Sequence, residues 1–337
     1  MKYKFYILIV NYNGYQDTIE CLESLYHLGN QNFQTIVIDN SNLDNDFDHL
    51  RAWANGEMSF ESDTNFPQYV KPLVNKPIDY ISLQEEKLEK QVFGEKLLIV
   101  KAKENKGFAV ANNIALRYIQ KFGSSDDYIW LLNNDTVVAS DTMNQIKEQL
   151  KRISREEIES TLFGTPLREY YEPIKIQTIG GKYHRLSGIT SHIGEGLSYT
   201  DDFKIDNYKI DYPIGASMIF SMAFLRQVGL MNEEYFLFFE ELDWVERAKK
   251  IGGKTSIIPV FGVFHKHGKS TLSKNKKQKT EFIDLLSLRN RILFSRKYFK
   301  NYLWTVKLFI LTVTVLKRIF SGNFGRIPKI IKLIFTT

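Results

Sequence analysis

Short apolar runs alternate with amphipathic stretches through the first half of the chain. Four runs rich in Ile and Val have the length of buried strands: Lys4–Val10, Phe33–Asp39, Lys96–Lys101 and Tyr128–Leu132. The stretches Tyr15–Leu28 and Ala109–Phe122 carry apolar residues at helical spacing. This alternation predicts an α/β fold with a mixed, mainly parallel sheet flanked by helices.

Polar residues follow three of the predicted strands at their carboxyl ends: Asn11-Tyr12-Asn13, Asp39-Asn40-Ser41 and Asn133-Asn134-Asp135. Ligands of parallel α/β sheets bind beyond the carboxyl ends of the strands. We therefore expect a binding site at this edge.

The pattern is less regular in the rest of the chain. Residues from about 55 to 95 mix prolines with a charged helical piece and are interpreted as an insertion at the domain edge. Tyr170–Asp211 is typical of irregular β structure and loops. Further helices are predicted at Ser140–Ile158, Met222–Val228 and Glu240–Ile251. Further strands are predicted at Ile214–Phe220, Lys254–Ile258 and Phe261–His265. The last 70 residues are helical in pattern and basic.

Composition excludes several classes of protein. The 337 residues are 43% hydrophobic and 25% charged, with only 8 Pro and 20 Gly, as in an ordinary folded protein. The single cysteine, Cys21, excludes a disulfide within the chain and any zinc cluster built from cysteines, and it favours a reducing compartment.

Charge divides the chain unevenly. Lys266–Thr337 contains 17 Lys or Arg and two acids, a charge of +15, whereas Met1–His265 carries −9. A basic tail on an acidic body suggests an attachment surface for something anionic.

Two apolar segments are too short for a signal-peptide core or for a membrane span. Phe5–Val10 is short for a signal-peptide core. Leu303–Ile319 contains Lys307 and has an uncharged core of nine residues, below the length of a membrane span.

Six motifs occur in an order that resembles a family. They are Ile9–Gly14, Val37–Ser41, Asn105–Asn113, Leu131–Thr136, Gly215–Met218 and Phe236–Asp243, with His265 following. In this order they resemble the family 2 nucleotide-sugar glycosyltransferases with a GT-A type fold, over about residues 5 to 270. The rhamnosyltransferase-like branch, which makes bacterial surface polysaccharides, is the most similar. The resemblance implies a catalytic domain at 1–270, and the basic, helical pattern of the remaining residues predicts a membrane-associating region at 271–337.

The resemblance also implies a donor pocket. Asp39 would read the N3–H of uracil or thymine, although Asp39-Asn40-Ser41 is also a good turn sequence. Gly107 stands where a strand turns into a helix, which allows close backbone approach to an anionic group, and a polar cap is the alternative. The implied donor-binding residues are Asn11, Asn13, Asp39, Asn40, Asn105, Gly107, Phe108, Asn113, Asn133 and Asn134.

A metal site is implied where the family has its Asp-x-Asp signature. Here the first position is Asn133, so Asp135 is the expected ligand of Mg²⁺ or Mn²⁺, with the diphosphate supplying further oxygens. His265 would complete the metal site or contact the leaving phosphate, unless it is structural. His267 and Lys269 are weaker candidates for phosphate contacts.

An acidic cluster opens the predicted helix at Glu240. Inverting transfer needs a general base for the acceptor hydroxyl, and the resemblance implies Glu241, with Glu240 and Asp243 as alternatives. Acids in a first helical turn also stabilise a helix without any catalytic role.

The basic tail has an amphipathic pattern. Lys300 and Lys307 recur on one stripe, opposite an apolar face that includes Trp304, Phe309 and Val313. Such a helix fits the interface of an anionic membrane, and a helical subdomain with a solvated basic face is the alternative. No nucleic-acid-binding module is recognisable.

The resemblance implies a metal-dependent inverting glycosyltransferase, a hexosyl- or rhamnosyltransferase. It would move sugar from a UDP- or dTDP-sugar to a saccharide or lipid-linked saccharide in surface polysaccharide synthesis, in the cytoplasm on the inner face of the cell membrane. Two alternatives stay open: an inactive saccharide- or membrane-binding module, and a sugar nucleotidyltransferase. The latter needs a basic glycine-rich loop, but Asn11–Gln16 contains no Lys or Arg.

Overall fold

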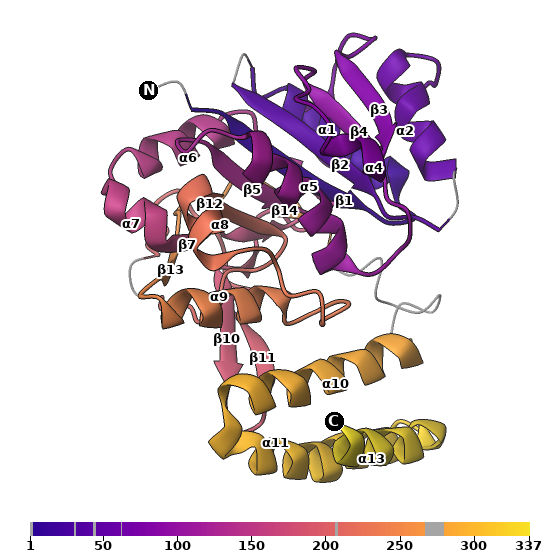
Figure 1. Cartoon of the computed structure of the whole chain (residues 1–337), viewed down its shortest axis with the longest axis vertical. Coiled ribbons are helices and arrows are strands. Elements are labelled where there is room, and N and C mark those ends of the chain that lie inside the picture. Colours follow the sequence, from indigo (N-terminus) through magenta and orange to yellow (C-terminus); the bar gives the residue numbers. More distant parts are fainter. Residues whose placement is uncertain (1–2, 30–31, 43–44, 62, 206–207, 267–279) are drawn as a thin grey trace.

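The computed structural model describes residues 3–29, 32–42, 45–61, 63–205, 208–266 and 280–337, and within them the central sheet has eight strands (Figure 1). In sheet order these are β13 (Lys254–Ile257), β7 (Thr161–Gly164), β12 (Ser217–Ser221), β5 (Tyr128–Leu132), β1 (Phe5–Asn11), β2 (Phe33–Asp39), β4 (Leu97–Lys101) and β3 (Tyr80–Gln84).

The sheet is mainly parallel. β5, β1, β2, β4 and β3 run parallel, and β12 pairs antiparallel with β5 and β7. Asn11 lies opposite Asp39, and Asp39 opposite Lys101, so these strands end at one edge. The predicted fold class and four N-terminal strands are therefore confirmed. The structure adds β3, which extends the sheet from within the segment interpreted as an insertion.

Helices cover both faces of this sheet. They are α1 (Tyr15–Tyr26), α2 (Asn45–Asn55), α3 (Pro67–Val70), α4 (Glu85–Leu88), α5 (Phe108–Phe122), α6 (Thr142–Leu150), α7 (Arg155–Ser160), α8 (Met222–Val228) and α9 (Glu240–Lys250). Side chains alternate along each strand, so Ile7 of β1 packs with α1 and α2, whereas Leu8 packs with α5, α8 and α9.

The single helix predicted over Ser140–Ile158 is two helices, α6 and α7. Ser154 explains the break, because its Oγ accepts a hydrogen bond from the backbone N–H of Glu157 at 3.2 Å and so caps α7.

Two small sheets flank the main one. The first contains β6 (Thr136–Val138), β14 (Val263–His265), β8 (Leu167–Glu169) and β9 (Ile176–Thr178). The second is the hairpin of β10 (Gly180–His184) and β11 (Ile189–Ile193). β14 runs antiparallel to β6, which brings His265 opposite Thr136.

The C-terminal region is helical, as predicted. Its elements are α10 (Glu281–Tyr298), η1 (Lys300–Tyr302), α11 (Leu303–Phe309), the π-helical η2 (Ile310–Thr314), α12 (Val315–Phe320), η3 (Phe324–Arg326) and α13 (Ile327–Thr336).

α10 packs on the body built around the central sheet, as part of its core. Leu293 and Phe294 belong to the same buried cluster as α5, α8 and α9. The body therefore includes α10, and only the helices after it form a separate layer (Figure 1). None of the described helices is long and apolar enough to cross a membrane.

Candidate functional site

Asp39 connects three strand ends. Its carboxylate is fully buried, with Oδ1 accepting from Asn11 Nδ2 at 2.8 Å and from the N–H of Ser41 at 3.2 Å. Oδ2 accepts from Lys101 Nζ at 2.9 Å. Both oxygens are thus engaged, and a base that approached Asp39 would compete with Lys101. The base-reading role of Asp39 stays a prediction.

The network continues to the end of β5. Thr18 Oγ donates to Asn11 Oδ1 at 2.7 Å, and Asn134 Nδ2 donates to Thr18 Oγ at 3.0 Å. The structure therefore brings Asn11, Asp39 and Asn134 together, as expected from their places at strand ends. Thr18 was not among the predicted site residues.

An open cavity of about 400 Å³ lies beside this network, at the start of α1 and α2. Asn13 is on its wall, in the left-handed region at φ 50°, and its N–H bonds to Ser41 Oγ at 2.8 Å. Asp46 is also on the wall, where it accepts from the N–H of Gly14 at 2.8 Å. The cavity is open enough for a flat ring, with amide and carboxylate groups at its rim.

The motif around Gly107 contacts a loop 130 residues further along the chain. Asn105 Oδ1 accepts from Asn40 Nδ2 at 2.9 Å and from the N–H of Gly107 at 3.0 Å. A Cβ on Gly107, whose φ is +98°, would lie 2.0 Å from the carbonyl oxygen of Phe236. The same carbonyl accepts from the N–H of Phe108 at 2.8 Å. Glycine is required here because the loop before α9 passes directly over it.

Asn113 has a structural task. Its Nδ2 donates to Met231 O at 2.9 Å and to Glu233 Oε1 at 2.8 Å, and its Oδ1 accepts from the N–H of Met231 at 2.9 Å. The whole amide is occupied in anchoring the loop that leads to α9.

The two predicted metal ligands lie together. His265 Nε2 is 3.1 Å from Asp135 Oδ1 and 3.3 Å from Asn133 Nδ2. His265 Nδ1 lies 2.7 Å from Gln177 Oε1. An amide oxygen only accepts, so Nδ1 carries a proton, and Nε2 is the ring nitrogen that faces Asp135.

This pair fits a divalent cation. Adjacent ligands in an octahedral shell with bonds of about 2.1 Å are about 3.0 Å apart, close to the observed separation. Burial raises the pKa of Asp135, but His265 and hydrogen bonds outweigh it and hold that pKa below its usual value. Among the described residues no group of three or more His, Cys, Asp or Glu forms a metal cluster, so further ligands would come from the substrate or water.

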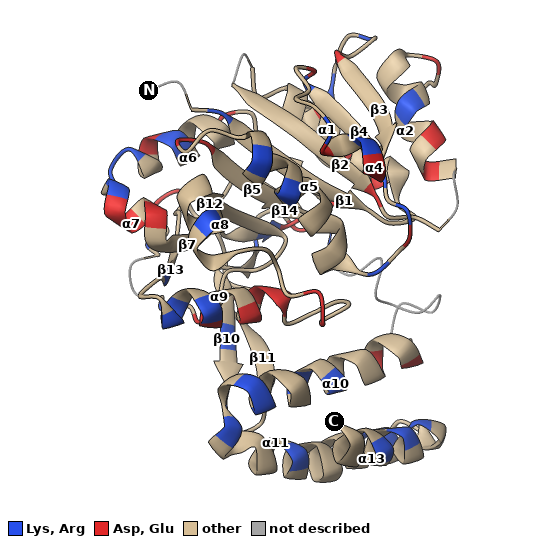
Figure 2. Cartoon of the chain, in the orientation of Figure 1, with Lys and Arg blue, Asp and Glu red and all other residues tan. Residues whose placement is uncertain are grey.

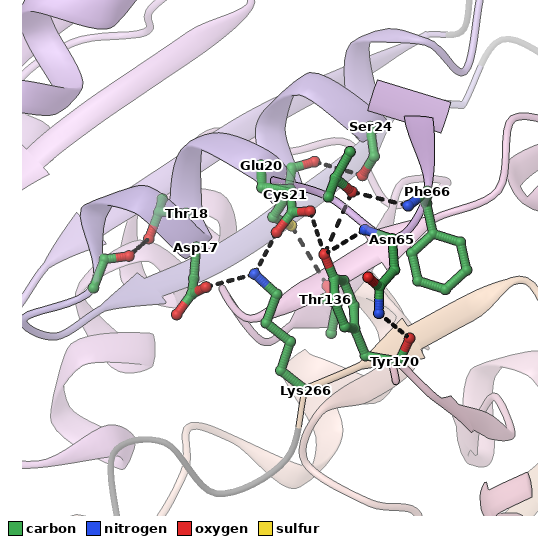
Figure 3. Close-up of polar contacts among 12 residues, drawn as sticks. Asp17, Thr18, Glu20, Cys21, Ser24, Asn65, Phe66, Thr136, Tyr170 and Lys266 are labelled. Atoms are coloured by element: carbon green, nitrogen blue, oxygen red, sulfur yellow. Dashed lines mark hydrogen bonds and ion pairs between the residues drawn. The ribbon is translucent and has the colours of Figure 1, made fainter. Parts of the chain in front are cut away.

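Lys266 fixes the strand that carries His265. Its ammonium group lies between Asp17, at 2.6 Å, and Glu20 of α1 (Figure 3). Glu20 also accepts from the hydroxyl of Tyr170 at 2.6 Å, and the N–H of Lys266 bonds to Asp135 O at 3.0 Å. Burial alone would lower the pKa of Lys266, but the nearby carboxylates of Glu20 and Asp17 outweigh it. The pKa is therefore raised above its usual value, and the ammonium stays charged. His267 and Lys269 lie outside the described residues.

The acids at the start of α9 follow two strained residues. Phe238 and Phe239 both have left-handed backbones, with φ of 72° and 74°. Glu240 is 4% exposed, and within the described part of the chain its Oε2 has no hydrogen-bond partner. Burial raises the pKa of Glu241 to about 7, and burial together with Glu241 raises that of Glu240 well above its usual value. Backbone strain together with carboxyl groups whose pKa values are raised is a feature of functional sites.

Asp243, the third acid, is engaged elsewhere. It accepts from Arg247 Nε at 2.9 Å, Lys297 Nζ at 2.7 Å and the hydroxyl of Tyr298 at 2.8 Å. Burial raises its pKa, but Lys297, Tyr298 and Asn232 outweigh this and lower it. Asp243 thus joins α9 to α10, whereas Glu240 keeps one oxygen without a partner in the described structure.

Several residues of the site were not predicted. Lys101 could have been found from the sequence, because it is a charged residue at the end of an apolar strand. No sequence signal marks Asp46 or Gln177. Asp46 is indistinguishable from an acid at a helix start, and Gln177 lies in a region interpreted as irregular. Nor does any signal mark Asn290 of α10, whose buried Nδ2 donates to the carbonyls of Leu237 at 2.9 Å and Phe238 at 3.1 Å.

Comparison with known proteins finds similarity in structure only. No family model matches the chain, and no curated protein matches it by sequence. A mannosyltransferase from Pyrobaculum calidifontis, solved with GDP-mannose and Mn²⁺, is similar with a TM-score of 0.50 at 12% identity, over 98% of this chain and 73% of that one.

Two further structures are similar over part of their length. S. aureus TarS 1–349 has a TM-score of 0.47 at 11% identity, over 86% of this chain and 64% of that one. GalNAc-T7 with UDP, GalNAc and Mn²⁺ has 0.48 at 13% identity, over 78% and 44%. This chain thus spans less than two thirds of either. Together with the sheet described above, the likeness to the mannosyltransferase shows that the chain has the GT-A type fold.

Proposed function

We propose that this protein is an inverting glycosyltransferase that uses a nucleotide diphosphate sugar. The observation that carries the proposal is the pair Glu240 and Glu241 after two left-handed residues: Glu240 is buried with an oxygen that has no partner in the described structure, and the pKa of Glu241 is raised. Glu241 is the proposed base, because a carboxylate whose pKa is near 7 both accepts a proton and is ionised at neutral pH.

The donor occupies the strand-end edge. The nucleoside would enter the cavity beside Asn13 and Asp46, with a uracil or thymine edge directed towards Asp39. The Gly107 segment, next to Phe236, would place the sugar in front of α9. The mannosyltransferase of the same fold was solved with GDP-mannose and Mn²⁺, which supports a nucleotide-sugar donor and a divalent cation here.

Asp135 and His265 would hold Mg²⁺ or Mn²⁺ through Oδ1 and Nε2. When bound, the ion neutralises the charge that grows on the departing diphosphate. Gln177 holds the imidazole in the tautomer that leaves Nε2 available, and Lys266 keeps β14 against α1.

The transfer is a single displacement. The hydroxyl oxygen of a saccharide or lipid-linked saccharide forms a bond to the anomeric carbon. The bond from that carbon to the diphosphate oxygen breaks, and its electron pair leaves with the nucleoside diphosphate. The hydroxyl proton passes to Glu241, and the configuration at the anomeric carbon inverts. A hexose or rhamnose for a surface polysaccharide is the transferred group that we propose.

A donor panel tests the proposal. The protein is mixed with UDP-, dTDP- and GDP-sugars and Mn²⁺, and its melting temperature is measured together with release of nucleoside diphosphate. We expect stabilisation by one donor class and slow hydrolysis that EDTA abolishes. Stabilisation with no turnover, with or without acceptors, would instead support the inactive saccharide-binding module.

A further inference from the structure

A second layer of helices lies beyond α10. α11, η2 and α12 form one continuous rod, and α13 lies beside it, both on the side of α10 away from the sheet (Figure 1). Their inner stripe packs on Leu288 and Ile292 of α10. It consists of Val306, Ile310, Ile330 and Ile334.

The outer side of this layer is apolar and exposed. On the rod, Trp304, Leu308 and Leu311 recur at helical spacing, and Trp304 and Phe320 are 78% and 87% exposed. The remaining exposed apolar residues of the layer are Leu316, Ile319, Phe324, Ile331 and Phe335. Two neighbouring helices thus present apolar side chains with no cover from the described chain.

The charges around this face all have one sign. Residues 300–337 contain seven Lys or Arg and no acid. Figure 2 shows blue but no red residues along α11 and α13. Asp284 of α10 pairs with Arg318 and with Arg326, the latter at 3.0 Å, and Glu281 pairs with Lys329. No acid partner among the described residues is recorded for the other four bases: Lys300, Lys307, Lys317 and Lys332.

We propose that the outer face of α11–α13 docks on the surface of an anionic bilayer. Apolar side chains would enter the boundary between headgroups and acyl chains, and the lysines would meet the phosphates. A second copy of the face fits poorly, because residues 300–337 supply no acid to pair with the lysines Lys300, Lys307, Lys317 and Lys332 of the other copy. The proposal does not rest on the proposed function, since membrane binding is measured without turnover.

Trp304 reports on this face directly. Trp53, Trp130 and Trp244 are at most 1% exposed, so a change in environment at the surface falls on Trp304. With vesicles of mixed phosphatidylcholine and phosphatidylglycerol, we expect a blue shift of its emission and flotation of the full chain. With phosphatidylcholine alone, we expect neither.

Two sets of variants locate the contact. Replacing both Trp304 and Phe320 by Ser should weaken vesicle binding about tenfold or more, because it removes two apolar anchors. The matched control replaces two exposed apolar residues of the body, Val92 and Ile251, by Ser and should bind as the parent does. Lys317→Gln with Lys332→Gln should weaken binding most at low salt.

Three results with vesicles would overturn the proposal, and a fourth result concerns self-association. They are equal flotation with neutral vesicles, no flotation with anionic vesicles, and unchanged binding of the Trp304–Phe320 double variant. A dimer in sedimentation velocity that the same double variant dissociates would also overturn it, in favour of a second copy on this face.

Discussion

Two acidic regions of the molecule differ in whether a basic side chain pairs with the carboxylate. At the end of β2, Asp39 accepts three hydrogen bonds, one of them from the ammonium of Lys101. At the start of α9, Glu240 keeps an oxygen with no partner in the described structure, and Glu241 has its pKa raised to about 7. Both regions have carboxylates in a low-dielectric setting, but only the first is compensated.

The difference separates scaffold from chemistry. A buried carboxylate whose oxygens all have hydrogen-bond partners holds strand ends in place. An uncompensated pair costs stability, and such a cost is typical of groups that must accept a proton during turnover. Asp243 gives the same lesson three residues after Glu240, because Lys297 and Tyr298 of α10, together with Asn232, outweigh burial and lower its pKa.

Glu241→Gln should have the largest effect. It removes the proposed base but keeps the size of the side chain, so we expect kcat to fall about 10³-fold with little change in donor affinity. Initial rates with donor and acceptor, and titration of the donor by calorimetry, measure the two quantities.

Glu246→Gln, on the same helix but paired with Lys249 at its surface, is the matched control and should keep the parent rate. Full transfer by Glu241→Gln would remove Glu241 from the mechanism. If Glu240→Gln alone abolished transfer, the base would be reassigned to Glu240.

Asp39→Asn should act on stability. Loss of its charge removes the 2.9 Å ion pair with Lys101 from around a fully buried carboxylate, which costs about 3 kcal/mol of unfolding free energy. Urea unfolding measures this cost. Asp48→Asn breaks the exposed pair with Arg51 and should cost well under about 1 kcal/mol. Equal midpoints for the two variants would contradict the scaffold role of Asp39.

The pH dependence of stability and of kcat tests whether the pKa of Glu241 is raised. Because the pKa of Glu241 rises from 4.5 to about 7 on folding, the folded protein holds more protons in that window. Its contribution to stability is therefore complete below pH 4.5 and is lost as the pH rises through about 7. Over the same interval kcat should rise as the base ionises. Glu241→Gln should flatten the stability trend, and an unchanged trend would refute the assignment.

Asn290→Ala should have the smallest effect. It deletes the two hydrogen bonds that hold Leu237 and Phe238 O, so the strained loop before Glu240 should relax and kcat fall about tenfold, with a stability loss of about 1–2 kcal/mol. Asn323→Ala removes amide hydrogen bonds within the C-terminal helices and should change neither transfer nor donor binding. A loss of donor affinity that matched the loss of rate would contradict a role confined to the base.

Much of the fold and part of the site follow from local pattern. The strands β1, β2, β4 and β5 were predicted within one residue, because alternation and apolar runs depend on near neighbours. The gathering of the strand-end polar residues at one edge of the sheet was predicted from its parallel topology. The prediction of one helix over Ser140–Ile158 was wrong, because the chain forms two helices there. The Ser154 cap outweighs the continuing apolar pattern.

What the sequence by itself determined is the alternation of elements, the strand-end polar residues and the separation of charge between body and tail. Only the tertiary structure decided which acids are compensated. Lys101 meets Asp39, Gln177 meets His265, and Asn290 meets the loop before α9, over separations of 62, 88 and 52 residues or more. Such pairs leave no periodic trace in the chain, because electrostatics and hydrogen bonding act through space. The chemistry of Glu241 depends on which partners the fold brings to it and which it withholds.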